Sequence, residues 1–374
     1  MKLSELKIGE LTAKLPIIQG GMGIGISLHN LAAAVANTGG VGIISGVQIG
    51  FREPNFIKNT LEANLHALEK EIALAKEKAT QGIIGINFMV AMENYDVLVK
   101  KAAQCGIDLI ISGAGLPLEL PSLVKGSKTK IAPIVSSGKA ASLICRMWDK
   151  KDNVAPDMIV VEGPLAGGHL GFSREELDSA DVPRLEDILQ DVKKVLEPFA
   201  KKYNKHIPIV VAGGIYDGID IAKFLELGAD GVQMGTRFIP TVECDADINY
   251  KMAHINAQKQ DIQLVTSPVG MPGRAIINDL MRRDEKNKHC LYKCLRQCKP
   301  KEIPYCISQS LINAANGDTD NALLFCGSQG YRAEKIQTVQ EVMDDLKQEI
   351  TACKSPKKNV SDTISSLRKV ELSY

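Results

Sequence analysis

Residues 208–236 read PIVVAGGIYDGIDIAKFLELGADGVQMGT and contain a complete strand–helix–strand unit. The apolar run 208–214 shows no alternation of polar side chains, as expected for a strand buried on both faces of a parallel sheet. Residues 219–227 have a helical pattern and end at Gly228, a suitable C-cap. A second apolar run follows at 231–236. The stretch therefore predicts a βαβ unit in which glycines follow the strands.

The same rhythm fills the first 240 residues. Further short apolar runs end in small or polar residues at 16–20, 41–46, 83–88, 109–113, 133–137 and 158–163. Helical patterns lie between them, for example at 28–37 and 59–78. Strands that alternate with helices in this way predict an α/β fold, a (β/α)8 TIM barrel over residues 1–240. An open doubly wound sheet is the alternative, but Gly21, Gly23 and Gly25 lack the spacing of its Gly-x-Gly-x-x-Gly turn.

The pattern changes in the C-terminal third. We expect helices at 244–258 and 337–354 and a loop at 268–273. Residues 241–354 are therefore predicted to be a helical segment packed on the barrel, with a cysteine-rich stretch at 290–306. The remaining residues, 355–374, form a polar tail.

The composition argues against several classes of protein. Of 374 residues, 45 are basic and 44 acidic, so the net charge of +1 gives no reason to expect a nucleic-acid partner. Nine cysteines are too dilute for a disulfide scaffold. The first 14 residues lack the apolar core of a signal peptide, and no apolar run reaches the ~18 residues of a membrane helix. We expect a cytoplasmic protein with reduced thiols, no membrane partner and a small-molecule substrate; a homodimer stays open.

Active sites of such barrels form where the strands end. One glycine-rich turn, Gln19–Gly23, follows the first strand, and Asn87 ends an otherwise apolar one. A tight turn and a helix N-cap are the structural alternatives for these two. His169 stands in the loop after Glu162, among Gly167, Gly168 and Gly171. Since histidine exchanges protons near neutral pH and the glycines leave space around it, His169 is the candidate catalytic residue.

Two small-residue loops predict a phosphate site. Ala212–Ile215 follows the seventh strand and Gln233–Thr236 follows the eighth. Loops at these two strands, with a short helix N-terminus, receive phosphate groups in many TIM barrels.

The cysteine-rich stretch raises a separate question. Cys290, Cys294 and Cys298 are spaced so that a helix would place them on one face, and Cys306 follows. Four thiolates could bind zinc or an iron–sulfur cluster, but this spacing matches no common motif. Buried or exposed reduced thiols are the alternative, and no metal ligand is assigned.

These motifs, in this order, resemble the nitronate monooxygenases, formerly called 2-nitropropane dioxygenases, whose scaffold is shared by the FMN-dependent enoyl-ACP reductases of type II. The resemblance covers roughly residues 14–280 and includes Gly270, Pro272, Arg274 and Asn278. It departs from the family at Glu162, where many members carry glutamine, and at Pro164-Leu165.

The resemblance implies FMN as the cofactor and assigns roles to individual residues. The residues implied to approach or bind the flavin are Gly21, Met22, Asn87, Glu162, Gly167, Gly168, Gly213 and Gly214, with Gln233, Met234, Gly235 and Thr236 at its phosphate end. His169 falls on the general base that acts on nitroalkanes. The implied reaction is oxidation of alkyl nitronates, with electrons passing through FMN to O2. The alternative is an NAD(P)H-dependent reductase of enoyl-thioesters or quinones, in which His169 would position the acyl carbonyl.

Overall fold

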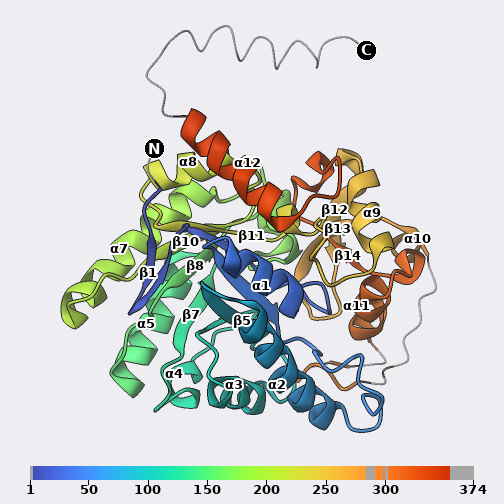
Figure 1. The fold of residues 1–374 in the computed structure, drawn as a ribbon, viewed down its shortest axis with the longest axis horizontal. Coiled ribbons are helices and arrows are strands. Elements are labelled where there is room, and N and C mark those ends of the chain that lie inside the picture. Colours follow the sequence, from blue (N-terminus) through green and yellow to red (C-terminus); the bar gives the residue numbers. More distant parts are fainter. Residues whose placement is uncertain (1–2, 284–289, 291, 297, 300–301, 354–374) are drawn as a thin grey trace, which may run out of the picture.

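The predicted barrel is confirmed in the computed structural model, which describes residues 3–283, 290, 292–296, 298–299 and 302–353. Eight parallel strands close the barrel in the order β10-β11-β3-β4-β5-β6-β7-β8 (Figure 1). Their bounds are β3 Ile17–Gln19, β4 Val41–Ser45, β5 Ile83–Met89, β6 Leu109–Gly113, β7 Lys130–Val135, β8 Ile159–Glu162, β10 Ile209–Ala212 and β11 Gly231–Met234. Each overlaps one of the apolar runs in the sequence, because strands of a closed barrel are buried on both faces.

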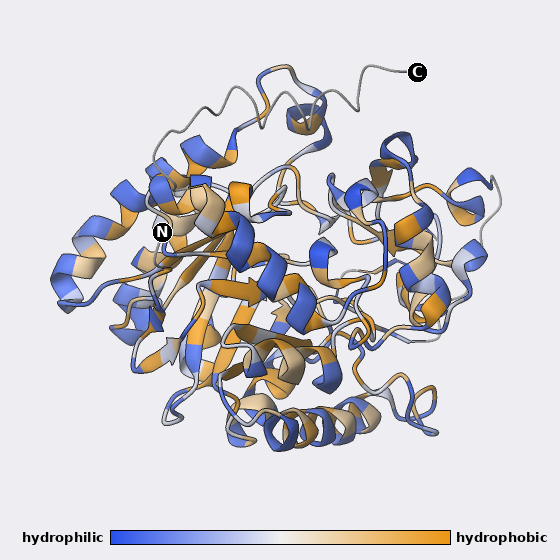
Figure 2. Ribbon diagram, turned by 45° about the horizontal axis from the view of Figure 1, so that its top comes forward, coloured by the Kyte–Doolittle hydropathy of each residue, from blue (hydrophilic) through white to orange (hydrophobic). Residues whose placement is uncertain are grey.

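Helices cover the outside of the barrel. They are α1 His29–Asn37, α2 Thr60–Lys78, α3 Tyr95–Gln104, α4 Leu120–Leu123, α5 Gly138–Asp152, α6 Arg174–Asp178, α7 Leu185–Tyr203 and α8 Gly218–Glu226. Figure 2 shows strands of hydrophobic residues inside the barrel and many hydrophilic residues on the helices around it. Asp217 begins α8 with a capping box, its carboxylate accepting from the backbone N–H of Asp220 at 2.9 Å.

A hairpin that the sequence analysis did not predict closes the N-terminal end of the barrel. Strands β1 (Leu6–Ile8) and β2 (Leu11–Ala13) pair antiparallel. Leu6 and Ile8 are buried in one cluster with residues that begin barrel strands, such as Ile83 and Leu109. The opposite end, where the strands finish, is left for a ligand.

The C-terminal third holds helices, as expected, and also a small sheet that was not expected. The helices are α9 Ile248–Asn256, α10 Asp279–Arg282, α11 Ile307–Ala315 and α12 Val339–Ala352. The strands are β12 Ile262–Thr266, β13 Pro272–Ile276 and β14 Leu324–Phe325, and β9 (Gly168–His169) pairs with β13. The prediction of a loop over 268–273 was therefore wrong at its end, where Pro272 and Gly273 begin β13. Proline and glycine are weak strand formers, but tertiary pairing outweighs that propensity here.

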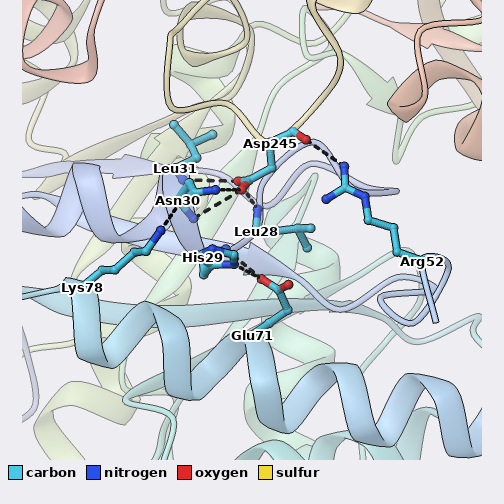
Figure 3. Close-up of polar contacts among 8 residues, drawn as sticks. All are labelled: Leu28, His29, Asn30, Leu31, Arg52, Glu71, Lys78 and Asp245. Carbon is cyan, nitrogen blue, oxygen red and sulfur yellow. Dashed lines mark hydrogen bonds and ion pairs between the residues drawn. The ribbon is translucent and has the colours of Figure 1, made fainter.

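Asp245 ties the C-terminal third to the barrel (Figure 3). Its carboxylate accepts backbone N–H bonds from Leu28 at 2.7 Å and Leu31 at 3.2 Å, at the start of α1. Arg52 donates to the backbone carbonyl of Asp245 at 2.9 Å. Because α1 has no cap of its own at Leu28, a carboxylate distant in sequence satisfies the helix N-terminus.

Among the described residues, no helix has the length and apolar composition needed to cross a membrane.

Candidate active site

The barrel strands end around one cavity, and every site residue predicted from the sequence lines it. These are Gly21, Met22, Asn87, Glu162, Gly167, Gly168, His169, Gly213, Gly214, Gln233, Met234, Gly235 and Thr236. Met89, Ile134 and Leu165 add apolar surface. Parallel strands bring these separate motifs together, since their carboxyl ends meet at one rim of the barrel.

Strand pairing positions His169. The residue lies on β9, opposite Gly273 of β13, and the N–H of Leu170 donates to the carbonyl of Pro272 at 2.9 Å. Arg274, also on β13, donates to the carbonyls of Pro164 and Ala166 at 2.7 and 2.6 Å. The β8–β9 loop is thus held at several of its backbone atoms, by strand pairing and by the Arg274 guanidinium, and these contacts place the histidine.

The surroundings of the His169 ring keep it uncharged. Its Nε2 lies 2.8 Å from the hydroxyl oxygen of Ser267, and its ring packs edge-on against Phe325 at a centroid distance of 4.9 Å. Burial lowers the pKa of His169 to about 4. A neutral imidazole at physiological pH retains a lone pair that can accept a proton.

Glu162 is the last residue of β8, and Asn87 lies two residues before the end of β5. Burial raises the pKa of Glu162 to about 7, so the carboxyl group is partly protonated at neutral pH and can donate a hydrogen bond. The side-chain amide of Asn87 donates to the carbonyl of Ile111 at 3.3 Å. A Cβ at Gly21 would lie 2.5 Å from Cβ of Asn87, so glycine is required beside this amide.

At the predicted phosphate end of the cavity, the backbone has the glycine turns and the short helix that the sequence predicted. Gly213 and Gly214 have φ of 97° and 84°, in the region that favours glycine. A short 3-10 helix, Thr236–Phe238, begins directly after Gly235. The N–H of Gly327 donates to the hydroxyl of Thr236 at 2.9 Å, which adds the segment after β14 to this wall.

Buried polar atoms in the cavity indicate that it receives a polar ligand. Ser45 Oγ, Gln233 Oε1 and Ser328 Oγ are buried and meet no hydrogen-bond partner within the described part of the chain. Leaving such groups unpaired costs roughly 1–3 kcal/mol each, so native proteins normally satisfy them. A bound molecule with several donors and acceptors would do so.

Sequence reasoning missed several residues of this site. Ser267 and Phe325 contact His169 from the small sheet, and Ser45 and Ser328 line the cavity. Ser45 is the next-to-last residue of the strand predicted at 41–46, and Ser328 lies in a Gly-Ser-Gln-Gly run like the other small-residue loops, so both carried a usable signal. Ser267 directly precedes the loop predicted at 268–273, and nothing in the sequence pairs it with His169.

The other described histidines lie outside the cavity. His29 contacts Glu71 at 2.7 Å, His66 contacts Glu53 at 3.1 Å and His206 contacts Asp230 at 2.6 Å. His254 is buried against the carbonyl of Tyr250, and His289 lies outside the described residues. These positions agree with the choice of His169 as the candidate.

The cysteine-rich stretch is not the helix that would line up three thiols on one face. Cys294 and Cys298 lie in an irregular segment, where Lys293 has a φ of 43° and Leu295 pairs with Met92 in an isolated β-bridge. Within the described residues, no three His, Cys, Asp or Glu side chains are grouped to hold a metal ion.

Comparison with known protein families identifies the family to which this barrel belongs. The model of the nitronate monooxygenase family matches residues 4–349. The chain belongs to the nitronate monooxygenase family. It is therefore an oxidoreductase of that family. A probable nitronate monooxygenase of Staphylococcus saprophyticus is 28% identical over 346 residues, covering 86% of this chain and 89% of the relative.

The chain is also similar to proteins that are named for other activities. A carboxyl-CoA dehydrogenase of Rhodococcus jostii is 28% identical over 272 residues, which cover 71% of this chain and 64% of the relative. Among solved structures, FabK from Thermotoga maritima superposes with a TM-score of 0.69 and 25% identity, covering 96% of each chain. A nitroalkane oxidase from Streptomyces ansochromogenes also gives 0.69, at 21% identity, and covers 91% of this chain and 96% of that one. The similarity to the nitroalkane oxidase supports the fold alone.

Proposed function

We propose that this protein is an FMN-dependent nitronate monooxygenase that oxidises alkyl nitronates, and nitroalkanes after deprotonation, with O2. The observation that carries the proposal is the neutral His169 in a cavity with a glycine-lined wall, in a chain of this family. A neutral imidazole can take the α-proton of a nitroalkane, which is the step that distinguishes this substrate from its nitronate.

The residues of the cavity fit FMN. The unpaired polar atoms of Ser45 and Gln233 offer hydrogen bonds to a heteroaromatic ring system. Gly213, Gly214 and Gly235 expose backbone at the end of the cavity where a phosphate is expected, and Ser328 adds an unpaired hydroxyl. Bound FMN would accept electrons from the nitronate and pass them to O2.

The protein's own groups would position the substrate and move one proton. His169 takes the α-proton on its unprotonated nitrogen while Ser267 fixes the orientation of the ring through Nε2. Phe325 and the β8–β9 loop keep water from the imidazole and maintain its low pKa. Met89, Ile134 and Leu165 provide apolar surface for an alkyl chain. A nitronate has already lost its α-proton, so its oxidation depends on binding and orientation.

A second candidate is an NAD(P)H-dependent reductase of enoyl-thioesters or quinones. It is favoured by the likeness to FabK over nearly the whole chain and by the relative named for a carboxyl-CoA substrate. In that reaction His169 would donate a hydrogen bond to the acyl carbonyl, because a neutral imidazole carries one N–H.

The first test is the cofactor. Purified protein should be yellow, and the chromophore released by heat should chromatograph as FMN and not as FAD. Ethylnitronate should then support O2 consumption. Colourless protein that gains no flavin spectrum on mixing with FMN would refute the proposal.

A further inference from the structure

Tyr216 is a buried residue of the cavity wall that has no role in the reaction proposed above. It lies two positions after Gly214, in the segment between β10 and α8, and is only 6% exposed. Its hydroxyl is buried and meets no hydrogen-bond partner within the described part of the chain. Because a buried hydroxyl without a partner is costly, a ligand in the cavity is expected to supply one.

Two arginines hold the ring of Tyr216 in place. The Cζ atoms of Arg332 and Arg237 lie 4.7 and 5.3 Å from the ring centroid. A guanidinium within about 6 Å of an aromatic ring is attracted to its face. Each guanidinium is itself fixed, since Arg332 donates to the carboxylate of Asp217 at 2.6 Å and Arg237 donates to Oε1 of Gln337 at 2.9 Å. The contacts therefore restrict the orientation of the phenol.

The partner that the Tyr216 hydroxyl lacks is a hydrogen-bond acceptor. Arginine side chains can only donate, so the two guanidinium groups beside the ring cannot take the phenolic hydrogen. Burial raises the pKa of Tyr216 above its ordinary value, which keeps this hydrogen on the oxygen at neutral pH. The hydroxyl is thus a positioned donor for an acceptor atom of a ligand.

The place of Tyr216 in the cavity indicates which acceptor that is. The residue follows the turn formed by Gly213 and Gly214, and Arg237 beside it belongs to the 3-10 helix that begins at Thr236. Both elements form the end of the cavity where a phosphate is expected. A phosphate monoester presents strong acceptor oxygens, so it complements a wall of backbone N–H groups and a phenolic donor.

We propose that the hydroxyl of Tyr216 donates a hydrogen bond to the phosphate of the flavin, and that this bond makes the site select FMN over riboflavin. The inference rests on the proposed function, because it requires a flavin in this cavity. A hydrogen bond to a charged acceptor contributes more than one between neutral groups. Loss of the hydroxyl should therefore weaken the binding of the phosphorylated flavin and leave that of riboflavin unchanged.

The test changes the hydroxyl and leaves the arginines, because these also form ion pairs with Asp217 and Asp345. Tyr216→Phe keeps the ring and removes one oxygen atom. Fluorescence titration of flavin-free protein should show FMN affinity reduced roughly tenfold or more, with riboflavin affinity equal to that of the wild type. The melting temperature of the flavin-free variant should be no lower than that of the wild type, since the lost hydroxyl had no partner in the protein.

Tyr95→Phe is the matched control. Tyr95 is also buried, but it lies outside the cavity and its hydroxyl oxygen is 2.9 Å from that of Ser112. This variant should keep FMN affinity and lose melting temperature, because it breaks a hydrogen bond within the protein.

The outcomes separate this inference from the proposed function. If Tyr216→Phe binds FMN as tightly as the wild type does, or loses affinity equally for FMN and riboflavin, the inference is wrong and the proposed function stands. A lower melting temperature of flavin-free Tyr216→Phe would also overturn the inference, since the hydroxyl would then have a partner in the protein. Wild-type protein that binds neither flavin would overturn both.

Discussion

The Nε2 atom of His169 lies 2.8 Å from Oγ of Ser267, although 98 positions separate the two residues in sequence. The contact joins β9, which follows barrel strand β8, to the residue directly after β12 in the small sheet of the C-terminal third. It fixes the orientation of an imidazole whose pKa burial lowers to about 4. The C-terminal third therefore completes the candidate site.

The first prediction concerns the proton that His169 takes. His169→Asn should lose roughly 10²–10⁴-fold in kcat/KM on neutral nitroethane, because the asparagine amide cannot act as a general base. The loss on ethylnitronate should be far smaller, since that anion has already lost its α-proton. Steady-state O2 consumption on both substrates, with FMN content measured in each preparation, gives the ratio. Equal losses on the two substrates would mean that His169 shapes the pocket and does not move the proton.

The second prediction concerns the buried carboxyl of Glu162. Its pKa is raised from 4.5 to about 7 in the folded protein, so unfolding releases a proton between those pH values. The free energy of unfolding should fall as the pH rises from 4.5 to 7 and stay level above. In flavin-free protein, Glu162→Gln should remove this fall and add at most about 3 kcal/mol of stability at pH 8.

Denaturant unfolding at pH 4.5 and pH 8 measures that difference. The wild type and Glu162→Gln should be nearly equal at the lower pH. Equal stability at both pH values would show that Glu162 is not the group that titrates. FMN affinity measured across the same range then reports whether protonated Glu162 contributes to flavin binding.

The third prediction tests the proposed phosphate end. Gly214 has a φ of 84°, and an added Cβ would lie 2.9 Å from Leu165 in the loop above it. Gly214→Ala should weaken FMN binding by about tenfold or more, because the added Cβ would displace Leu165 and the cavity wall that both residues form. The left-handed conformation should separately cost roughly 1–2 kcal/mol of stability. Fluorescence titration of flavin-free protein with FMN measures the affinity.

Gly126→Ala is a matched control for backbone strain. Gly126 has a similar φ of 85°, meets nothing within 4 Å of its added Cβ and does not line the cavity. Gly126→Ala should lower the free energy of unfolding about as much as Gly214→Ala does, while FMN affinity stays unchanged. A parallel loss of affinity in both variants would assign the effect to general destabilisation.

The fourth prediction concerns Asp245. Asp245→Ala removes the carboxylate that caps α1 from a distant part of the chain, and it should lower the free energy of unfolding by about 1–2 kcal/mol. Asp245→Asn keeps an acceptor and should lose less. Denaturant midpoints measure both, with Asp181→Ala at an exposed loop position as the control. An Asp245→Ala protein as stable as the control would show that the cap contributes nothing.

The sequence was sufficient to predict the barrel. Parallel strands that are buried on both faces consist of continuous apolar runs, and in this chain glycines follow many of these runs. Ile209–Ala212 and Gly231–Met234 fall within the predicted runs for this reason. The same logic placed His169, Glu162 and Gln233 around one cavity.

The parts of the site that the sequence did not predict depend on contacts between segments that are distant in the chain. Pairing of β9 with β13 is visible only in three dimensions, since Gly168–His169 is too short to carry a strand pattern. The Ser267 contact follows from that pairing. The spacing of Cys290, Cys294 and Cys298 had suggested a helix, whereas Lys293 within this stretch has a left-handed conformation.

The central claim is that a nitronate, and not a nicotinamide, delivers electrons in this cavity. The most direct measurement is anaerobic mixing of the FMN-loaded protein with ethylnitronate, and separately with NADH or NADPH, while the flavin absorbance is followed. We predict rapid bleaching by ethylnitronate, slow or no bleaching by either nicotinamide, and return of the yellow colour when O2 is admitted. Rapid bleaching by NADH or NADPH together with no response to ethylnitronate would contradict the monooxygenase assignment and favour the reductase.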